Sequence, residues 1–399
     1  MRRTGKLHTI LNDHWLSFYN KYKHNIREDI VSAVVKVLAC GTSFLGFRLY
    51  QCGQCDIIDS VYHTCKSRFC TSCGRKQTEN WILKHLDLLP KTTYQHITFT
   101  LPKELQEVIW LNRWLINALM PAPAQILTAV AQSVGVTPGI FIALHTAGRD
   151  LKGNVHFHCV STLSGLSPNT HKFIPYFRYN RRMLAKVKHR WRNHVLKILN
   201  TALDERRLKI PKNFNLNEFI PCTSFIDWIG KNKERPWVVH FAKPSKSHRH
   251  LVEYLGAYLK KPAIGETRIQ QYDGNNVTYE YFDHHENETV VITMPVLQFI
   301  KRLVRHIPDN YFRMVRYYNW LSTRTRNKWL PFIYEKLQQK IQQFHLFSWQ
   351  DLSIKTFGID PLVCKHCKKG RLSLVDTYYA YSAKELTKIH QYVGLAKSA

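Results

Sequence analysis

GIFIALHTAGRDLKGNVHFHCVST, residues 139–162, decides most about the fold, because it has the pattern of a β-hairpin. Residues 139–145 and 155–162 are rich in branched and aromatic side chains, as strands are. Residues 147–154 between them hold glycine, asparagine and aspartate, which favour a turn. The stretch therefore predicts two adjacent antiparallel strands.

The hairpin places histidines on one face of the predicted sheet. Side chains alternate along a strand, so His156 and His158 share one face while Phe157 points to the other, the core. A turn centred just after Asp150 sets His145 opposite His156, with their Cβ atoms within about 5 Å. Three imidazoles from two strands can hold one divalent metal and leave open positions, as a catalytic site needs. The alternative is a set of polar histidines on a solvated face.

Strand and helix patterns alternate on both sides of the hairpin, which predicts an α+β protein. Hydrophobic residues make up 44% of the 399 residues, so wholesale disorder is excluded and two or three domains are expected. Further strands are predicted at 96–101 and 237–242, and helices at 26–38, 104–116, 124–134, 183–200 and 250–260.

Tyr254 and Tyr258 are spaced by four and would lie on one face of the helix predicted at 250–260. No other two of the 20 tyrosines have this spacing. A tyrosine hydroxyl can attack phosphorus and hold the product as a phosphotyrosine. Its ordinary pKa is about 10, so it needs activation, which a metal on the phosphate can supply. The alternative is ordinary core packing.

Two Cys-x-x-Cys pairs, Cys52/Cys55 and Cys70/Cys73, are separated by 14 residues. Each pair can place two thiolates on one turn, and together they predict a tetrahedral structural zinc. Cys65 and His63 lie between the pairs and are alternative ligands.

The other cysteines give weaker signals. Cys364 and Cys367 form a third pair with no second pair downstream, so they are either metal ligands or an exposed pair. His366 and His390 are the further candidate ligands in that part of the chain. The remaining cysteines are isolated, and core packing is their expected role: Cys40, Cys159 and Cys222.

The charge of the chain points to a polyanionic partner. Lys and Arg number 58 against 28 Asp and Glu, a net charge of +30. Several of the basic residues flank the predicted hairpin and tyrosine helix and are candidate phosphate contacts: Lys152, Lys243, Arg249, Lys260 and Lys261. No membrane span is expected, because the longest run without charged side chains is broken by prolines. Paired cysteines without an export signal favour metal binding in a reducing cytosol.

Several motifs occur in an order that resembles one protein family. They are Cys65-Lys-Ser-Arg-Phe-Cys70-Thr-Ser-Cys73, His96-Ile-Thr-Phe-Thr-Leu-Pro102, His156-Phe-His158, Tyr254-Leu-Gly-Ala-Tyr258 and Arg305-His-Ile-Pro308. The chain is similar to the HUH single-strand endonucleases. Within them it most resembles the two-tyrosine rolling-circle transposases of the insertion-sequence-ninety-one type.

The resemblance implies a ferredoxin-like α+β catalytic domain with a central antiparallel sheet and helices. A zinc-ribbon-like domain would precede it, and a mostly helical region would follow it. The resemblance also implies Mg²⁺ or Mn²⁺ on His156 and His158, and cleavage of single-stranded DNA. Tyr254 and Tyr258 would be the nucleophiles that leave a 5′-phosphotyrosine and a free 3′-OH. His145 is the inferred third ligand, with His96 and His250 as alternatives.

Four units are expected along the chain. Residues 1–90 would form a helical and zinc-binding DNA-binding domain, and 91–265 the catalytic domain. Residues 266–355 would be an accessory DNA-binding region, and 356–399 a tail with the last cysteine pair.

Two other functions remain open at this point. One is a zinc-ribbon nucleic-acid-binding protein without catalysis, which fits the charge and the cysteines equally well. The other is a replication initiator or plasmid nickase, which shares the chemistry. In the leading interpretation the protein is bacterial, cytoplasmic and nucleoid-associated, and its partners are single-stranded element ends and target DNA.

Overall fold

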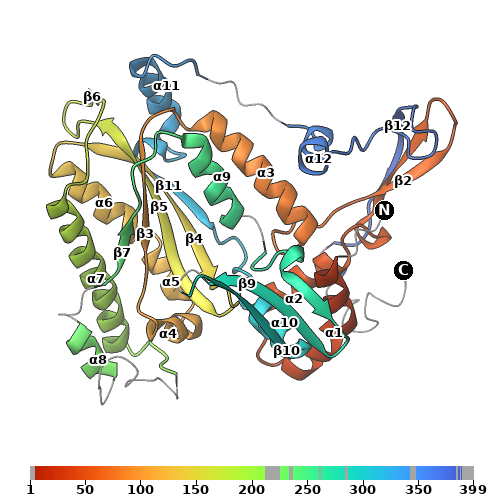
Figure 1. Ribbon diagram of the computed structural model, residues 1–399, viewed down its shortest axis with the longest axis horizontal. Helices are drawn as coiled ribbons and strands as arrows, with labels where there is room; N and C mark the ends of the chain where they lie inside the picture. The colour runs from red at the N-terminus through yellow and green to blue at the C-terminus, as the bar shows by residue number, and fades with distance from the viewer. Residues whose placement is uncertain are drawn as a thin grey trace.

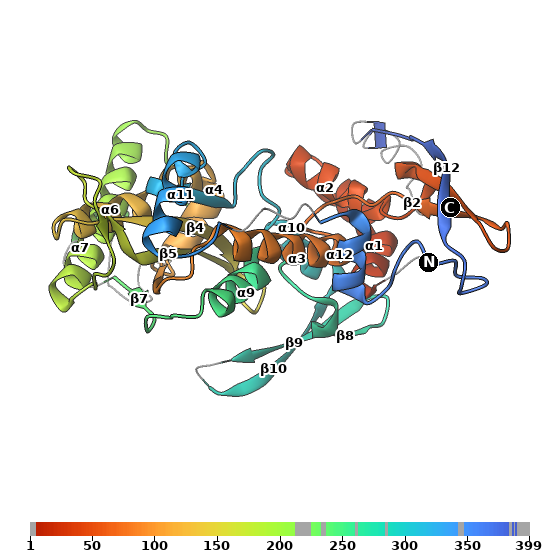
Figure 2. The same ribbon diagram turned by 90° about the horizontal axis from the view of Figure 1, so that it is seen from above.

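The computed structural model describes residues 5–211, 225–232, 237–259, 262–283, 286–341, 347–382, 385, 386 and 388. Four residues considered above, Cys222, Lys260, Lys261 and His390, lie outside the described residues. Tyr258 lies within a helix, but its side chain is also outside the description. The chain is elongated, and helix α1 (Lys6–Tyr22) and strand β12 (Leu372–Tyr378) lie at the end opposite the main sheet (Figure 2).

The main sheet is antiparallel and six-stranded, in the order β11-β4-β5-β3-β7, with β6 beside β5 (Figure 1). Its central hairpin is the one that the sequence predicts. The bounds of its strands are Tyr94–Phe99 (β3), Thr137–Ala147 (β4), Gly153–Leu166 (β5), Phe173–Ile174 (β6), Val239–Phe241 (β7) and Val315–Tyr318 (β11). A mixed α+β fold with a central antiparallel sheet is therefore present.

Helices cover one face of this sheet and form the first core. Phe157 lies in this core with no exposed surface, beside Trp191, so alternation along β5 puts His156 and His158 on the other face. The covering helices are Leu105–Leu111 (α4), Trp114–Leu119 (α5), Ala122–Gln132 (α6), Arg181–Asp204 (α7) and Phe225–Asn232 (α8).

Among the described residues, one apolar stretch, Trp114–Gln132, is long and apolar enough to cross a membrane by length and composition alone. It consists of the short helices α5 and α6, and 61% of its most apolar part is buried inside the protein. Leu119 and Leu127 pack in the first core, which accounts for its apolar character.

The opposite face of the sheet is covered by α3 (Thr71–Leu88), α9 (His248–Leu259), η3 (Asn319–Leu321) and α11 (Arg326–Lys336). Leu251, Val252 and Leu255 of α9 are buried there. At Gly256 the two helices α3 and α9 approach so closely that a Cβ would lie 2.5 Å from Cγ1 of Ile82. This packing fixes the helix that carries the tyrosine pair.

A second core is formed jointly by residues that precede strand β3 in the sequence and residues that follow helix α9. It contains α1 (Lys6–Tyr22) and α2 (Glu28–Leu38), which bury apolar faces against a sheet ordered β10-β9-β8 and against α10. These later elements are Glu266–Arg268 (η2), Ile269–Tyr272 (β8), Asn276–Asp283 (β9), Glu288–Pro295 (β10) and Val296–Val304 (α10).

Two expectations are corrected by this second core. The region after the main domain is not mostly helical, because three strands precede α10. The domain boundaries expected after residues 90 and 265 do not coincide with the boundaries of the packed cores either. Helices α1 and α2, residues 69–73 and residues 264–307 share one core, whereas most of α3 packs on the main sheet. The apolar faces of α1 and α2 are covered by elements distant in sequence, which are the strands β8–β10 and helix α10.

A third small sheet joins strands from the two ends of the chain. Its order is β12-β1-β2, from Leu372–Tyr378, Phe47–Cys52 and Ile58–Tyr62, and a short turn of helix, Ser43–Leu45 (η1), precedes it. Between the main sheet and β12, helix α12 (Trp349–Phe357) lies beside α3. Lys76 Nζ of α3 donates to Ser353 Oγ of α12 at 2.8 Å. The C-terminal part therefore returns along α3 to the N-terminal end of the molecule (Figure 1).

Candidate metal and tyrosine site

Three histidines converge on the main sheet as the hairpin pattern predicts. His145 of β4 pairs with His156 of β5. Nδ1 of His145 lies 3.1 Å from Nε2 of His156, which in turn lies 3.1 Å from Nε2 of His158. The ligand atoms of all three lie within 4.8 Å of one another. The predicted register is confirmed.

The turn of this hairpin is anchored in the second core. Leu151 has a positive φ of 62°, which closes the turn and sends its side chain, with no exposed surface, into that core. Tyr279 donates from its hydroxyl to the Asp150 carbonyl at 2.8 Å, and His306 Nε2 lies 3.0 Å from the Leu151 carbonyl. These contacts hold the strand ends that carry His145 and His156.

Burial keeps these imidazoles neutral. Burial away from solvent is the main cause that lowers the pKa of His158, and the neighbouring histidines lower it further, to about 2. Burial also lowers the pKa of His145 and of His156. Nδ1 of His156 lies 2.8 Å from the Asn154 carbonyl and donates to it, which leaves the lone pair on Nε2 directed at the cluster. Neutral imidazole lone pairs are what a metal ligand requires.

The geometry fits a metal with ligands at right angles. Two nitrogens at about 2.1 Å from an octahedral ion lie about 3 Å apart, close to the 3.1 Å separations of the cluster. An octahedral ion held by three such ligands keeps three further positions for other ligands. His145, His156 and His158 are therefore the residues suited to hold a divalent ion.

His96 of β3, an alternative third ligand from the sequence, lies on the outer side of His158. Its Nε2 is 3.0 Å from Nδ1 of His158, the nitrogen that faces away from His156. The two rings stack with centroids 5.2 Å apart. His96 thus orients a candidate ligand. The other alternative, His250, is an exposed residue at the start of α9.

Tyr254 lies beside the histidines and is open to solvent. Its ring is 41% exposed, and its centroid lies 5.6 Å from that of His96 and 6.5 Å from that of His158. A large bound molecule could therefore reach both the phenol and the histidines. Tyr258 follows one turn later in α9, with its side chain outside the description.

The predicted phosphate contacts are found at exposed positions. Lys152 of the hairpin turn lies 3.5 Å from Asp150, and its side chain is 69% exposed. Lys243 is exposed after β7, and Arg249 lies 3.4 Å from Glu253 on α9.

A cavity of about 300 Å³ beside His145 is lined by basic residues that are not among the predicted phosphate contacts. Arg68, Arg149 and Arg268 line it. Burial lowers the pKa of Arg68 to about 10, so it stays protonated at neutral pH, and its Nη1 has no hydrogen-bond partner among the described residues. A buried cation with an unmet donor is suited to an anionic group. Its place between Cys65 and Cys70 was the only signal in the sequence.

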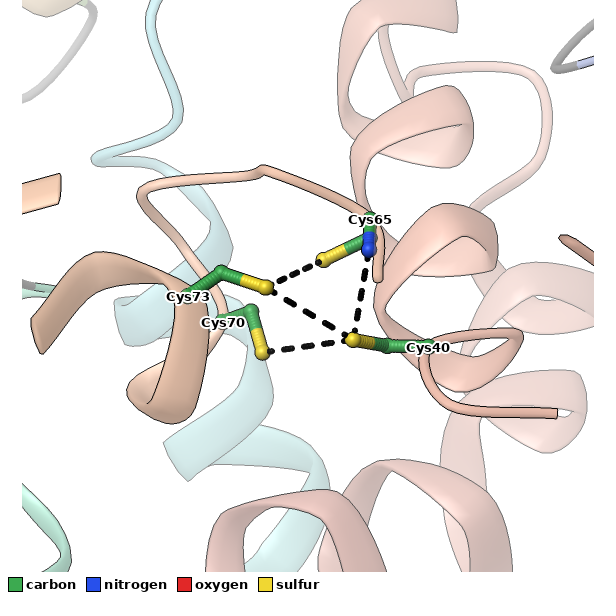
Figure 3. Close-up of side chains that lie close together, drawn as sticks. All are labelled: Cys40, Cys65, Cys70 and Cys73. Carbon is green, nitrogen blue, oxygen red and sulfur yellow. Dashed lines mark hydrogen bonds between the residues drawn. The ribbon is translucent and has the colours of Figure 1, made fainter. Parts of the chain in front are cut away.

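The cysteines form two clusters and not the single predicted set. Cys40, Cys65, Cys70 and Cys73 meet at the end of α2 and the start of α3 (Figure 3). Their closest Sγ separations are 3.6 Å for Cys65 and Cys73 and 3.7 Å for Cys40 and Cys73.

The predicted zinc set Cys52, Cys55, Cys70 and Cys73 is therefore wrong. The hairpin of β1 and β2 carries Cys52 and Cys55 away from the start of α3, to a second cluster with Cys364 and Cys367. Cys65 is confirmed as a member of the first cluster. Cys40, expected in a core, completes it, whereas Cys159 is buried in the first core as expected.

Comparison with known proteins gives two family matches. A model described as a transposase zinc-binding domain matches residues 10–101, and one described as a putative transposase matches residues 139–328. The chain is 35% identical over 321 residues to the transposase for insertion sequence element IS801 of Pseudomonas savastanoi pv. phaseolicola. That match covers 78% of this chain and 75% of the relative.

A second relative is the putative transposase y4qJ of Sinorhizobium fredii. It is 28% identical over 298 residues, which is 72% of this chain and 73% of the relative. No solved structure matches the chain.

Proposed function

The chain belongs to the IS91-type (insertion-sequence-ninety-one type) transposase family, and from this we propose that it cuts and rejoins single-stranded DNA at element ends by a rolling-circle-like mechanism. The observation that carries the proposal is the position of Tyr254 beside His158, whose ring centroid lies 6.5 Å from that of Tyr254, in a cluster where His156 Nε2 lies 3.1 Å from a nitrogen of each of the other two histidines. A nucleophile next to a metal site is the arrangement needed for phosphoryl transfer to an enzyme, and here the exposed ring of Tyr254 forms the side of the site that faces solvent.

The proposed reaction exchanges one phosphodiester for another. The Tyr254 oxygen attacks phosphorus, a Tyr O–P bond forms and the bond from phosphorus to the 3′ oxygen breaks. The phenolic proton ends on that 3′ oxygen, so the products are a 5′-phosphotyrosine and a free 3′-OH. Tyr258, one turn along α9, would perform the second transfer, and each rejoining step reverses the first reaction.

The proposed catalytic ion is Mn²⁺ or Mg²⁺ on His145, His156 and His158. When bound, the ion polarises the scissile phosphate and offsets the charge that develops on it. Mg²⁺ loses its bound water reluctantly, whereas Mn²⁺ belongs to the first-row metals that also bind nitrogen ligands. We therefore expect Mn²⁺ to support cleavage at a lower concentration than Mg²⁺.

Basic side chains on both sides of this site support DNA as the partner. Lys152 and Lys243 are exposed, and the cavity with Arg68 opens beside His145. In the proposed complex the backbone of a single strand follows these charges, and Arg68 binds a phosphate next to the scissile one. Zinc would be held by the first cysteine cluster at the start of α3, where it supports the helix that packs on α9.

The test is covalent labelling with single-stranded oligonucleotides from the ends of the element that encodes the chain. A 3′ label is expected to stay with the protein in SDS, whereas a 5′ label is expected on the released fragment. Tyr254→Phe and Tyr258→Phe should each reduce the labelled adduct, and the double variant should abolish it. Tyr311→Phe is the control, because Tyr311 is fully exposed. An adduct from the double variant contradicts the nucleophile assignment.

The same assay addresses the alternative of a DNA-binding protein without catalysis. In that case the wild-type chain would retain the oligonucleotides in a native gel but form no adduct with Mn²⁺ or Mg²⁺.

A further inference from the structure

The second cysteine cluster joins residues more than 300 positions apart in the sequence. Cys52 Sγ lies 3.7 Å from Cys367 Sγ, and Cys55 Sγ lies 3.7 Å from Cys364 Sγ. The ligand atoms of the four cysteines lie within 4.8 Å of one another. Cys364 and Cys367 fall outside both matched family regions, which end at residue 328.

These separations fit a shared zinc ion. Four sulfurs at about 2.3 Å from one tetrahedral ion are about 3.8 Å apart, against 3.7 Å for the two pairs here. A disulfide would require about 2.05 Å, and all four thiols are free.

The backbone around the cluster has the form of two facing metal-binding turns. The amide of Gln54 points at Cys52 Sγ at 3.4 Å, and that of Gly370 points at Cys367 Sγ at 3.2 Å. Amide donors of this kind stabilise the thiolate form that a metal requires. At Gly370 a Cβ would overlap Cys52 Sγ, so the two turns approach as closely as a glycine allows.

The apolar contacts around this cluster are too few to hold it alone. Its buried core consists of Tyr50, Cys52, Cys364 and Leu372. Small units with so little apolar burial generally need a metal or a disulfide to stay folded. Backbone bonds join the same segments, as in Gly53 N to the Arg371 carbonyl at 3.1 Å and the pairing of β1 with β12.

We propose that Cys52, Cys55, Cys364 and Cys367 bind a second zinc ion, distinct from that of the first cluster, which fastens the C-terminal segment to the N-terminal hairpin. The zinc joins the hairpin of β1 and β2 to the segment before β12. The chain between these two parts includes α3 and α12, which pack against each other. The zinc holds α12 against α3, where Lys76 lies over the rings of Trp349 and Phe357 at 5.8 and 5.6 Å. Helix α3 carries Cys73 at its start and packs against α9 towards its other end.

Zinc content measured by mass spectrometry on the full chain tests the proposal. The wild type is expected to hold two zinc ions per chain, and Cys364→Ser/Cys367→Ser one. His366→Ser is the matched control, because this exposed residue lies between the two ligands and outside the cluster; it should keep two. One zinc in the wild type, or two in the double serine variant, would overturn the proposal.

A pair of glycine variants tests the geometry without removing a ligand. Gly370→Ala is expected to lower the affinity of the second site for zinc at least tenfold, because the new Cβ displaces Cys52 Sγ. Competition with a chromophoric chelator measures this affinity. Gly53→Ala should leave it unchanged, since a Cβ there meets nothing within 4 Å. Hydrogen exchange should show β12 losing protection in Gly370→Ala only. Equal zinc affinity in both variants would count against the site.

Discussion

His145 lies directly opposite His156 across the β4–β5 pair, with Nδ1 of one 3.1 Å from Nε2 of the other. The pairing brings an imidazole from each strand to one point, to which His158 adds a third. The cluster is thus a product of strand register, and removing any one histidine should leave the strands paired.

We predict that His156→Ala removes divalent-metal binding and lowers cleavage by at least a hundredfold. The variant loses the central proposed ligand, whose Nε2 lies 3.1 Å from a nitrogen of each of the other two histidines. Titration calorimetry with Mn²⁺ and the adduct assay measure the two effects. His189→Ala on the exposed surface of α7 is the control, and unchanged zinc content reports intact folding. Cleavage at the wild-type rate by His156→Ala would refute the ligand assignment.

His96→Ala should weaken Mn²⁺ binding by about 10–100-fold, the usual effect of losing a group that orients a metal ligand. His96 Nε2 holds Nδ1 of His158 at 3.0 Å and so directs the opposite nitrogen at the metal. His96→Gln retains a polar group at a similar position and should recover part of the affinity. If His96→Ala binds Mn²⁺ as tightly as the wild type, His96 does not orient His158.

Gly256→Ala should reduce adduct formation, because a Cβ 2.5 Å from Ile82 Cγ1 pushes α9, which carries Tyr254, away from α3. Overpacking of this kind costs about 1–3 kcal/mol. The double variant Gly256→Ala/Ile82→Ala should recover activity, since it removes the clashing atom. Gly230→Ala in α8 is the control, because nothing lies within 4 Å of its added Cβ. A fully active Gly256→Ala would show that the close approach is not required.

Stability should fall in mild acid partly through His306. Burial, with nearby Arg305, Arg113 and Arg68, lowers its pKa to about 4, although the Leu151 carbonyl opposes this shift. The unfolded chain therefore takes up the proton first, and stability present above pH 6.5 is lost as the pH falls towards 4. One such group contributes a loss of about 2 kcal/mol between pH 7 and pH 5.

Urea unfolding at pH 7 and pH 5 measures this contribution. His306→Gln keeps a donor for the Leu151 carbonyl but does not titrate in this range. Its loss of stability between the two pH values should be smaller than that of the wild type. An identical loss in both proteins would mean that His306 is not held neutral.

Binding of single-stranded DNA should weaken steeply with added salt, as the net charge of +30 implies. Each lost phosphate contact reduces the slope of log affinity against log salt by about 0.7 for single strands. Lys243→Ala should show this reduction, whereas Lys21→Ala on α1 should not. Fluorescence anisotropy between low and moderate KCl measures the slope. A salt-insensitive wild type would argue against a charged DNA path.

The sequence by itself determined the hairpin, its register and the face that carries the histidines. Alternation along a strand and the length of a turn are local properties, so His145, His156 and His158 could be brought together by counting. The helix with the tyrosine pair follows equally from local periodicity, with its start at His248 against the expected 250.

Only the tertiary structure decided how the cysteines divide. Cys40 stands alone in the sequence and the pair Cys364/Cys367 has no second pair downstream, yet each completes a cluster. Spacing shows that two thiols share a turn but not which turns meet, because that depends on where a hairpin and a distant segment pack. The same holds for Arg68, whose burial beside His145 results from the contact between two cores formed by separate parts of the chain.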